Sequence, residues 1–306
     1  MRLQKKYLLT LAAAIGLALP AQGAVITGES EAYGLSADLN LNVPLVIGTA
    51  NVAANLAPVA PAAGTAPPPY MNTNSLLSLD VQLGSFLSGP LLLDTASVLD
   101  VKTGVINSSA SSNVDGGLGA RMANAVNTIN GLNLGAVVTP LLSGAVTITA
   151  TTIQTMSTVS GDFGALVANG SLVVENLVIK VLGITVATIN GEVAPNTGID
   201  VSGILGGVSI LLNAQTLNGD AVSSLSLTTN AIQVGFSNVT VPDVGTGLNG
   251  SIVIGHTAAS LDAGASPAVP SAVPEPASAL LMLGGVGCLF ARRQWKRRKH
   301  ADAAAA

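Results

Sequence analysis

The sequence predicts a mainly β protein whose body is an antiparallel β-sandwich or a barrel-like fold, and three observations support this prediction. Of the 306 residues, 49% are hydrophobic but only 3% are aromatic and 9% are charged, so the apolar character comes from small and branched aliphatic side chains. Many short stretches alternate apolar and polar residues, which is the period of a half-buried strand. Asn-Gly dipeptides, which favour the positive φ angles of tight hairpins, lie between several of these stretches. A solenoid is the alternative, although no repeat of fixed period is found.

The first 23 residues have the three regions of a secretory signal peptide. Basic residues come first, namely Arg2, Lys5 and Lys6. The apolar stretch that follows, 8–19, is shorter than the roughly 20 residues of a membrane span. Ala21 and Gly23 are small residues at positions −3 and −1 before Ala24. We therefore expect a signal helix that signal peptidase removes after Gly23 or Ala24, with an uncleaved anchor as the alternative.

Residues 24–265 form the predicted β-rich body. Apolar runs indicate strands at 35–43, 77–83, 91–101, 146–152, 172–181, 184–189, 208–212, 225–234 and 252–254. Four dipeptides predict hairpin turns: Asn169-Gly170, Asn190-Gly191, Asn218-Gly219 and Asn249-Gly250.

Two stretches of the body predict something other than strands. Residues 52–70 hold five prolines among alanines, which favours a long surface loop. In residues 116–143, the spacing of Met122, Val126 and Ile129 approaches that of a helix, so we expect one short helix there.

Charge is strongly segregated along the chain. Between Ala24 and Ala272 the sequence has 3 basic and 14 acidic residues, a balance of −11, while the other nine basic residues lie near the two ends. Such an acidic body excludes nucleic acid as a partner. The single cysteine, Cys288, lies close to the C-terminus, so the body contains no disulfide.

Candidate catalytic residues are sparse. His256 is the one histidine of the body, and no G-x-S-x-G motif accompanies it. A hydrolase reaction would need His256 with a nucleophile, or two carboxylates that the fold brings together. We therefore predict a protein that is not an enzyme, with a secreted hydrolase as the alternative.

Ligand-binding motifs are equally weak. Residues 245–250 match the dinucleotide pattern G-x-G-x-x-G, but a strand-like run follows where a helix is required, which indicates a glycine-rich turn. Residues 113–117 resemble the start of a calcium loop but lack its later ligands. We predict no metal site and no cofactor. The four glycosylation sequons, at Asn107, Asn169, Asn238 and Asn249, match chance expectation for this composition.

The C-terminal segment 273–300 has three parts. Val273-Pro274-Glu275-Pro276 comes first, and residues 279–291 are apolar. A basic cluster follows, consisting of Arg292, Arg293, Lys296, Arg297, Arg298 and Lys299. Basic residues after an apolar segment stay on the cytoplasmic side, so we expect a single transmembrane helix with a cytoplasmic basic anchor. Residues 277–291 are short for a permanent span, which suits an anchor that is later cut.

This tripartite tail resembles the PEP-CTERM sorting signal of exported bacterial proteins. The resemblance implies that the inner membrane holds the precursor transiently and that an exosortase acts near Pro274, Glu275 and Pro276. Residues 266–272 are then a linker between body and sorting signal.

The body is similar to the choice-of-anchor P family at 32–36, 103–109 and 160–174, over about 32–258. That similarity implies export and anchoring but no assigned activity. We therefore expect a non-enzymatic protein of the cell surface, envelope or extracellular biofilm matrix, with signal peptidase and exosortase as processing partners. A surface polysaccharide or the matrix would be its ligand, and an adhesive or ligand-binding β module is a further alternative.

Overall fold

The computed structural model describes residues 23–45, 48–88, 94–139, 144–241 and 245–264. Every regular element in these ranges is a strand. The strands are β1 (Ala24–Leu45), β2 (Gly48–Leu56), β3 (Ala62–Ala66), β4 (Tyr70–Leu76), β5 (Leu79–Ser88), β6 (Asp94–Thr103), β7 (Ile106–Ser112), β8 (Arg121–Val138), β9 (Val146–Asp162), β10 (Ala165–Val181), β11 (Ile184–Glu192), β12 (Thr197–Ile199), β13 (Val208–Gly219), β14 (Ser224–Val241) and β15 (Gly245–Gly264).

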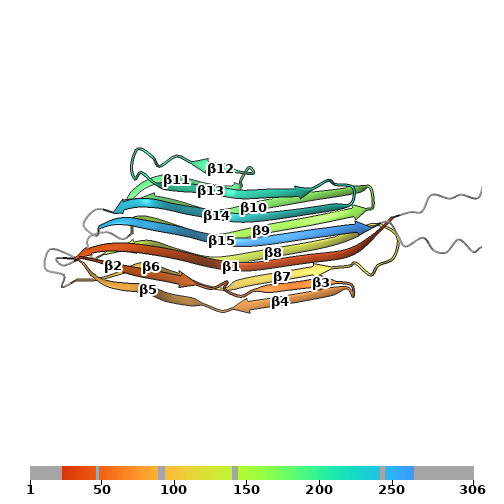
Figure 1. Cartoon of the computed structure of the whole chain (residues 1–306), viewed down its shortest axis with the longest axis horizontal. Helices are drawn as coiled ribbons and strands as arrows, with labels where there is room; N and C mark the ends of the chain where they lie inside the picture. The colour runs from red at the N-terminus through yellow and green to blue at the C-terminus, as the bar shows by residue number, and fades with distance from the viewer. Residues whose placement is uncertain (1–22, 46–47, 89–93, 140–143, 242–244, 265–306) are drawn as a thin grey trace, which may run out of the picture. The chain divides into compact units, whose positions relative to one another are not determined.

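The strands form two antiparallel sheets that pack face to face (Figure 1). The first sheet, sheet A, has the order β12-β13-β14-β15-β1-β2, and β3 also pairs with β1. The second, sheet B, has the order β11-β10-β9-β8-β6-β5, and β7 links β4 to β8. The prediction of a mainly β, antiparallel fold is confirmed. Because the two sheets share no strand pairing within the described ranges, the architecture is a sandwich, and the barrel-like and solenoid alternatives are wrong.

The first and last strands of the body are neighbours. β1 pairs with β15 along nearly its whole length, from Ala24 opposite Gly264 to Asn40 opposite Asn249. The described part of the chain therefore begins and ends side by side at one end of sheet A, as Figure 1 shows.

The strands are longer than the apolar runs suggested, and bulges interrupt the alternation within them. In β10 the pairing with β11 shifts between Val174 and Leu177, at Asn176, whose φ is +52°. Such a shift moves the following side chains to the opposite parity in sequence. It lies inside the predicted run 172–181, and the part of β10 that the run omits is 165–171.

Three of the four predicted Asn-Gly hairpins are wrong. Asn218-Gly219 does precede the turn between β13 and β14. The other three dipeptides lie inside β10, β11 and β15, where Gly191 and Gly250 have φ angles of +96° and +121°. Positive φ serves a mid-strand bulge as well as it serves a turn, so the dipeptide does not distinguish the two.

The long proline- and alanine-rich loop predicted at 52–70 is also wrong. β2 continues to Leu56, and β3 occupies Ala62–Ala66 as a partner of β1. The prolines fall in the short connections 57–61 and 67–69, where no ladder donor is needed.

The short helix predicted within 116–143 does not form, because most of this stretch is the strand β8. β8 pairs with β9 on one side and with β6 and β7 on the other, and pairing on both sides outweighs weak helical spacing.

Two hydrophobic clusters fill the space between the sheets. The larger contains residues such as Leu39, Ile148 and Ile254, and the smaller contains residues such as Val25, Val159 and Leu261. Between them lies a belt of buried polar side chains: Ser30, Ser108, Asn127, Thr155, Ser157, Thr229 and Thr257. Hydrogen bonds join several of these groups and offset the free-energy cost of burying them.

Both terminal signals lie outside the described residues, so the signal helix and the transmembrane helix remain predictions. No helix within the described ranges is long and apolar enough to cross a membrane.

Candidate functional site

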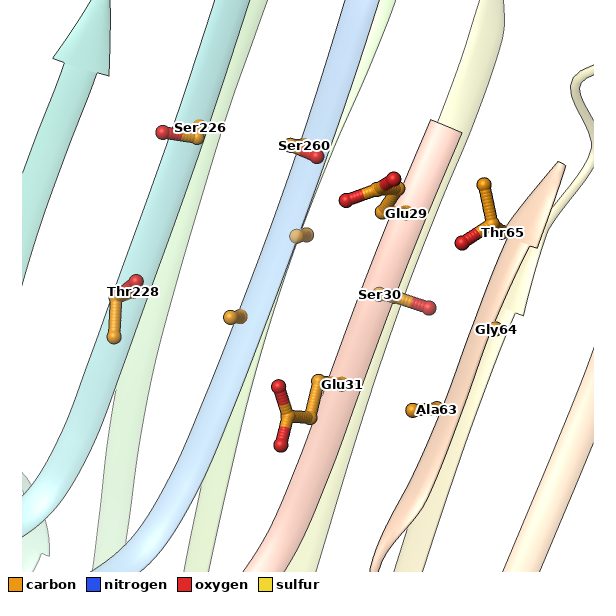
Figure 2. Close-up of a pocket in the computed structure, with 11 residues that line it drawn as sticks. Glu29, Ser30, Glu31, Ala63, Gly64, Thr65, Ser226, Thr228 and Ser260 are labelled. Carbon is orange, nitrogen blue, oxygen red and sulfur yellow. The ribbon is translucent and has the colours of Figure 1, made fainter. Parts of the chain in front are cut away.

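A surface hollow lies on the outer face of sheet A (Figure 2). Its volume is about 520 Å³. The side chains that line it come from β1, β3, β14 and β15, and Figure 2 shows Glu29 and Glu31 leaning from β1 toward β15. We call this hollow the sheet A groove; its lining is Glu29, Ser30, Glu31, Ala63, Gly64, Thr65, Ser226, Thr228, Ala258, Ala259 and Ser260.

Strand register explains the order of these groups. Glu29 lies opposite Ser260 on β15 and Thr65 on β3, while Glu31 lies opposite Ala258 and Ala63. Because Glu29 and Glu31 are two residues apart on one strand, their side chains share a face. The register therefore sets Glu29 between two hydroxyl groups and Glu31 between two alanines.

Gly64 lets β3 pack closely against a residue of sheet B. A side chain at Gly64 would collide with the ring of Tyr70, which packs beneath it. The Tyr70 hydroxyl lies 2.8 Å from the hydroxyl of Ser30, and burial raises the pKa of Tyr70 above its usual value. Gly64 thus lets β3 rest on an aromatic ring while the outer surface stays open.

The groove is suited to hydrogen bonding rather than to apolar contact. Two carboxylates accept hydrogen bonds, and four hydroxyl groups, those of Thr65, Ser226, Thr228 and Ser260, both donate and accept. None of the residues that line it is basic. Its chemistry fits a ligand rich in hydroxyl or ammonium groups and disfavours an anionic one.

His256 lies beyond the Glu31 end of the groove, in the next cross-strand row. It pairs with Tyr33 on β1 and with Asn230 on β14. Its ring stacks on that of Tyr33, with 4.4 Å between centroids, and its Nδ1 lies 2.7 Å from Oδ1 of Asn230. Burial lowers the pKa of His256 to about 4, so the imidazole is neutral near pH 7 and Nδ1 donates to the amide oxygen. These contacts give His256 a structural role, with an amide and not a nucleophile or a carboxylate at Nδ1.

The calcium-like stretch 113–117 uses its oxygen atoms within the fold. Oδ1 of Asn113 accepts the backbone N–H of Met122 at 2.6 Å. Oδ1 of Asp115 accepts the N–H of Gly117 and lies 2.6 Å from the guanidinium of Arg121. No group of three or more potential metal ligands occurs in the part of the chain that the structure describes.

The glycine pattern at 245–250 opens β15, a strand rather than the expected turn. Gly250 brings β15 close to β1, since a side chain there would collide with the carbonyl of Asp38. The glycines therefore serve strand pairing, and no helix N-terminus follows to hold a pyrophosphate.

Most of the predicted sorting residues lie outside the described ranges, namely Ala21, the motif at 273–276 and the basic cluster at 292–299. Gly23 and Ala24, on the two sides of the expected cleavage site, are described. Both are buried, and a side chain at Gly23 would collide with the Phe163 ring.

No family model and no curated protein sequence matches the chain. The PEP-CTERM and choice-of-anchor P resemblances therefore stay predictions.

The sequence did not identify the sheet A groove. Glu29 and Glu31 lie just before the strand predicted at 35–43, and their spacing of two residues was the one available signal, because in a strand it places two carboxylates on one face. The hydroxyl groups join them only through the strand order, which the sequence does not reveal.

Proposed function

We propose that this chain is an exported, non-enzymatic protein of the cell envelope or extracellular matrix. Signal peptidase removes its N-terminal segment, and an exosortase acts near Pro274, Glu275 and Pro276. The inner membrane holds it only in transit, and the sandwich is the part that functions at the surface.

The observation that carries this proposal is the pairing of Ala24 with Gly264. Both terminal signals join the body at the same end of sheet A, so cutting either signal leaves a sandwich whose two chain ends remain paired. A body of this kind stays folded whether it is held by one signal, by both or by neither.

The test is a pair of variants expressed in the native host. Pro274→Ala combined with Glu275→Ala is expected to leave full-length protein in the inner-membrane fraction, because the motif is altered. Pro267→Ala combined with Pro270→Ala is the matched control, since both prolines lie in or near the linker and outside the motif. Equal processing of the two variants would contradict the proposal.

The sheet A groove supports a second element of the proposal, an interaction with a neutral or amine-bearing surface polysaccharide. Each sugar ring presents several hydroxyl groups, and these complement the carboxylates and hydroxyls that line the groove. Tyr33 lies in the next cross-strand row, where its ring adds flat apolar surface.

Titration of the full chain with chitosan oligosaccharides, as an amine-bearing probe, tests the groove. Glu29→Gln combined with Glu31→Gln is expected to weaken binding, while Glu192→Gln on β11 is expected to leave it unchanged. Equal binding by the wild type, the double variant and Glu192→Gln would contradict the role of the groove in binding. The proposal of export would be unaffected.

A further inference from the structure

Three connections at one end of the sandwich each present an exposed apolar side chain. Leu118 lies between β7 and β8, Phe163 between β9 and β10, and Val222 between β13 and β14. Their exposed fractions are 57%, 40% and 46%. We call these three residues the apolar tips.

Contacts place the three connections at one end of the molecule. The N–H of Gly164 donates to the carbonyl of Val222 at 2.9 Å, which joins the second and third connections. Arg121, at the end of the first connection, lies opposite Gly161 in the β8–β9 ladder. The tips therefore come from strands of both sheets but share one rim.

The same rim carries both ends of the body. Gly23 lies against the Phe163 ring, and Ala263 donates its N–H to the carbonyl of Ser223 at 2.6 Å. From Gly264 to Pro274 the chain has ten residue steps, so it spans at most about 35 Å when fully extended. This length sets an upper limit of about 35 Å on the distance between Gly264, at this rim, and Pro274.

Hydrogen bonds from backbone N–H groups to aspartate side chains shape the turns that carry the tips. Asp162 accepts the N–H of Phe163 at 2.8 Å, and Asp220 accepts the N–H of Val222 at 2.8 Å. Asp115 accepts the N–H of Gly117 at 2.8 Å, just before Leu118. Each tip thus stands beside a carboxylate that is already used to shape its own turn. For Asp220, these hydrogen bonds hold the pKa well below its usual value, so it stays ionised.

We propose that the apolar tips dock this end of the sandwich on the lipid surface that holds the tail. This inference rests on the proposed sorting through the inner membrane. The tips enter the interfacial region, where their exposed apolar surface leaves water, and this burial is favourable in proportion to its area. Because carboxylates flank them, docking favours zwitterionic lipid, and anionic lipid weakens it.

The experiment uses the full chain reconstituted into phosphatidylcholine vesicles. Cys288→Ser removes the one native cysteine, and Leu118→Cys, Phe163→Cys or Val222→Cys then carries a polarity-sensitive fluorophore. Ile184→Cys is the matched control, since Ile184 is 55% exposed and begins β11, at the far end of β10 from Phe163. Phe163 packs on Gly23, so the labels at Leu118 and Val222 keep the test independent of any folding defect at Phe163.

Labels at the tips are expected to show blue-shifted emission and quenching by nitroxide-labelled lipid, and the label at Ile184 is expected to show neither. Adding phosphatidylglycerol is expected to reduce the quenching, and added salt to restore it. Tip labels that behave like the Ile184 label on vesicle-bound protein would overturn the docking and leave the sorting proposal intact.

Failure of the full chain to bind the vesicles at all would refute both the docking of the apolar tips and the proposed sorting through the inner membrane. If the tip labels show blue-shifted emission without lipid, and the shift grows with protein concentration, the tips form contacts between copies of the chain. That result would likewise overturn the docking.

Discussion

The hydroxyl of Ser157 on β9 lies 2.9 Å from the hydroxyl of Thr257 on β15, although 100 residues separate them in the chain. The Ser157 hydroxyl also lies 2.9 Å from that of Thr229 on β14. All three side chains are fully buried, so this cluster joins the two sheets through the polar belt between the hydrophobic clusters.

Removing one member of this cluster is expected to cost more than removing all of it. Ser157→Ala leaves two buried threonine hydroxyls with fewer partners, so the free energy of unfolding should fall by about 1–3 kcal/mol. Denaturant unfolding of the purified chain measures this loss. Ser160→Ala, on the outer face of the same strand, is the control and should change little.

The triple variant Ser157→Ala, Thr229→Val and Thr257→Val replaces the whole cluster by apolar groups of similar shape. It should be more stable than the single variant Ser157→Ala, because no buried hydroxyl of the cluster is then left without a partner. A triple variant less stable than the single one would show that the hydroxyl groups stabilise the fold by more than satisfying one another's hydrogen bonds.

Stability is expected to depend on pH through His256. Its folded pKa of about 4 is below the unfolded value near 6.5, so the unfolded state binds the proton first as pH falls. The contribution of neutral His256 to the free energy of unfolding is therefore fully present above about pH 6.5. As the pH falls from about 6.5 to 4, this free energy decreases by up to about 1.4 kcal/mol per pH unit. Carboxylates titrate in both proteins, so the difference between wild type and His256→Gln isolates the histidine. If the free energy of unfolding depends on pH in the same way in both proteins, the burial of His256 is contradicted.

Gly255→Ala is expected to destabilise the sandwich by about 2–5 kcal/mol. Gly255 has a φ of +65°, and a side-chain carbon there would lie 2.7 Å from Oγ1 of Thr155 and 2.8 Å from Cβ of Ala231. Gly183→Ala is the matched control, because its φ is +78° but the space around it is open. It should cost only the backbone part, about 1–2 kcal/mol. Equal losses in thermal unfolding would mean that the sheets do not approach closely at Gly255.

Two asparagines on β4 protect the edge of β3. The side-chain amide of Asn72 donates to the carbonyl of Ala63 at 2.7 Å, and that of Asn74 donates to the carbonyl of Pro61 at 2.9 Å. Unpaired edge carbonyls are templates for pairing with another chain. Asn72→Ala combined with Asn74→Ala should therefore raise concentration-dependent self-association in light scattering. Thr73→Ala, between them on the same strand, should scatter like wild type.

Alternation of apolar and polar residues predicted the strand class well, because one face of each sheet is buried. It located 172–181 within β10 and 225–234 within β14, and it missed that each run belongs to a strand of 17 or 18 residues. The run 172–181 omits the start of β10, where Asn169, Gly170 and Ser171 interrupt the apolar pattern although the strand pairs with β9 there. Asn249 illustrates the same limit, since its Oδ1 accepts the N–H of Asn238 on β14 in mid-sheet.

The candidate sites were less predictable than the fold. Pairing of Ala24 with Gly264 and of Glu29 with Ser260 depends on the first strand lying beside the last, which no local pattern encodes. The position of the apolar tips on one rim has the same origin, because connections distant in sequence meet only once both sheets are complete.

The measurement that tests the account most directly is intact mass spectrometry of the protein recovered from the cell surface or the extracellular matrix. We predict a chain that begins at Ala24 or Val25 and ends before Arg292, so that the acidic body has lost both basic ends. Recovery of surface-located protein that retains residues 292–299 would contradict it.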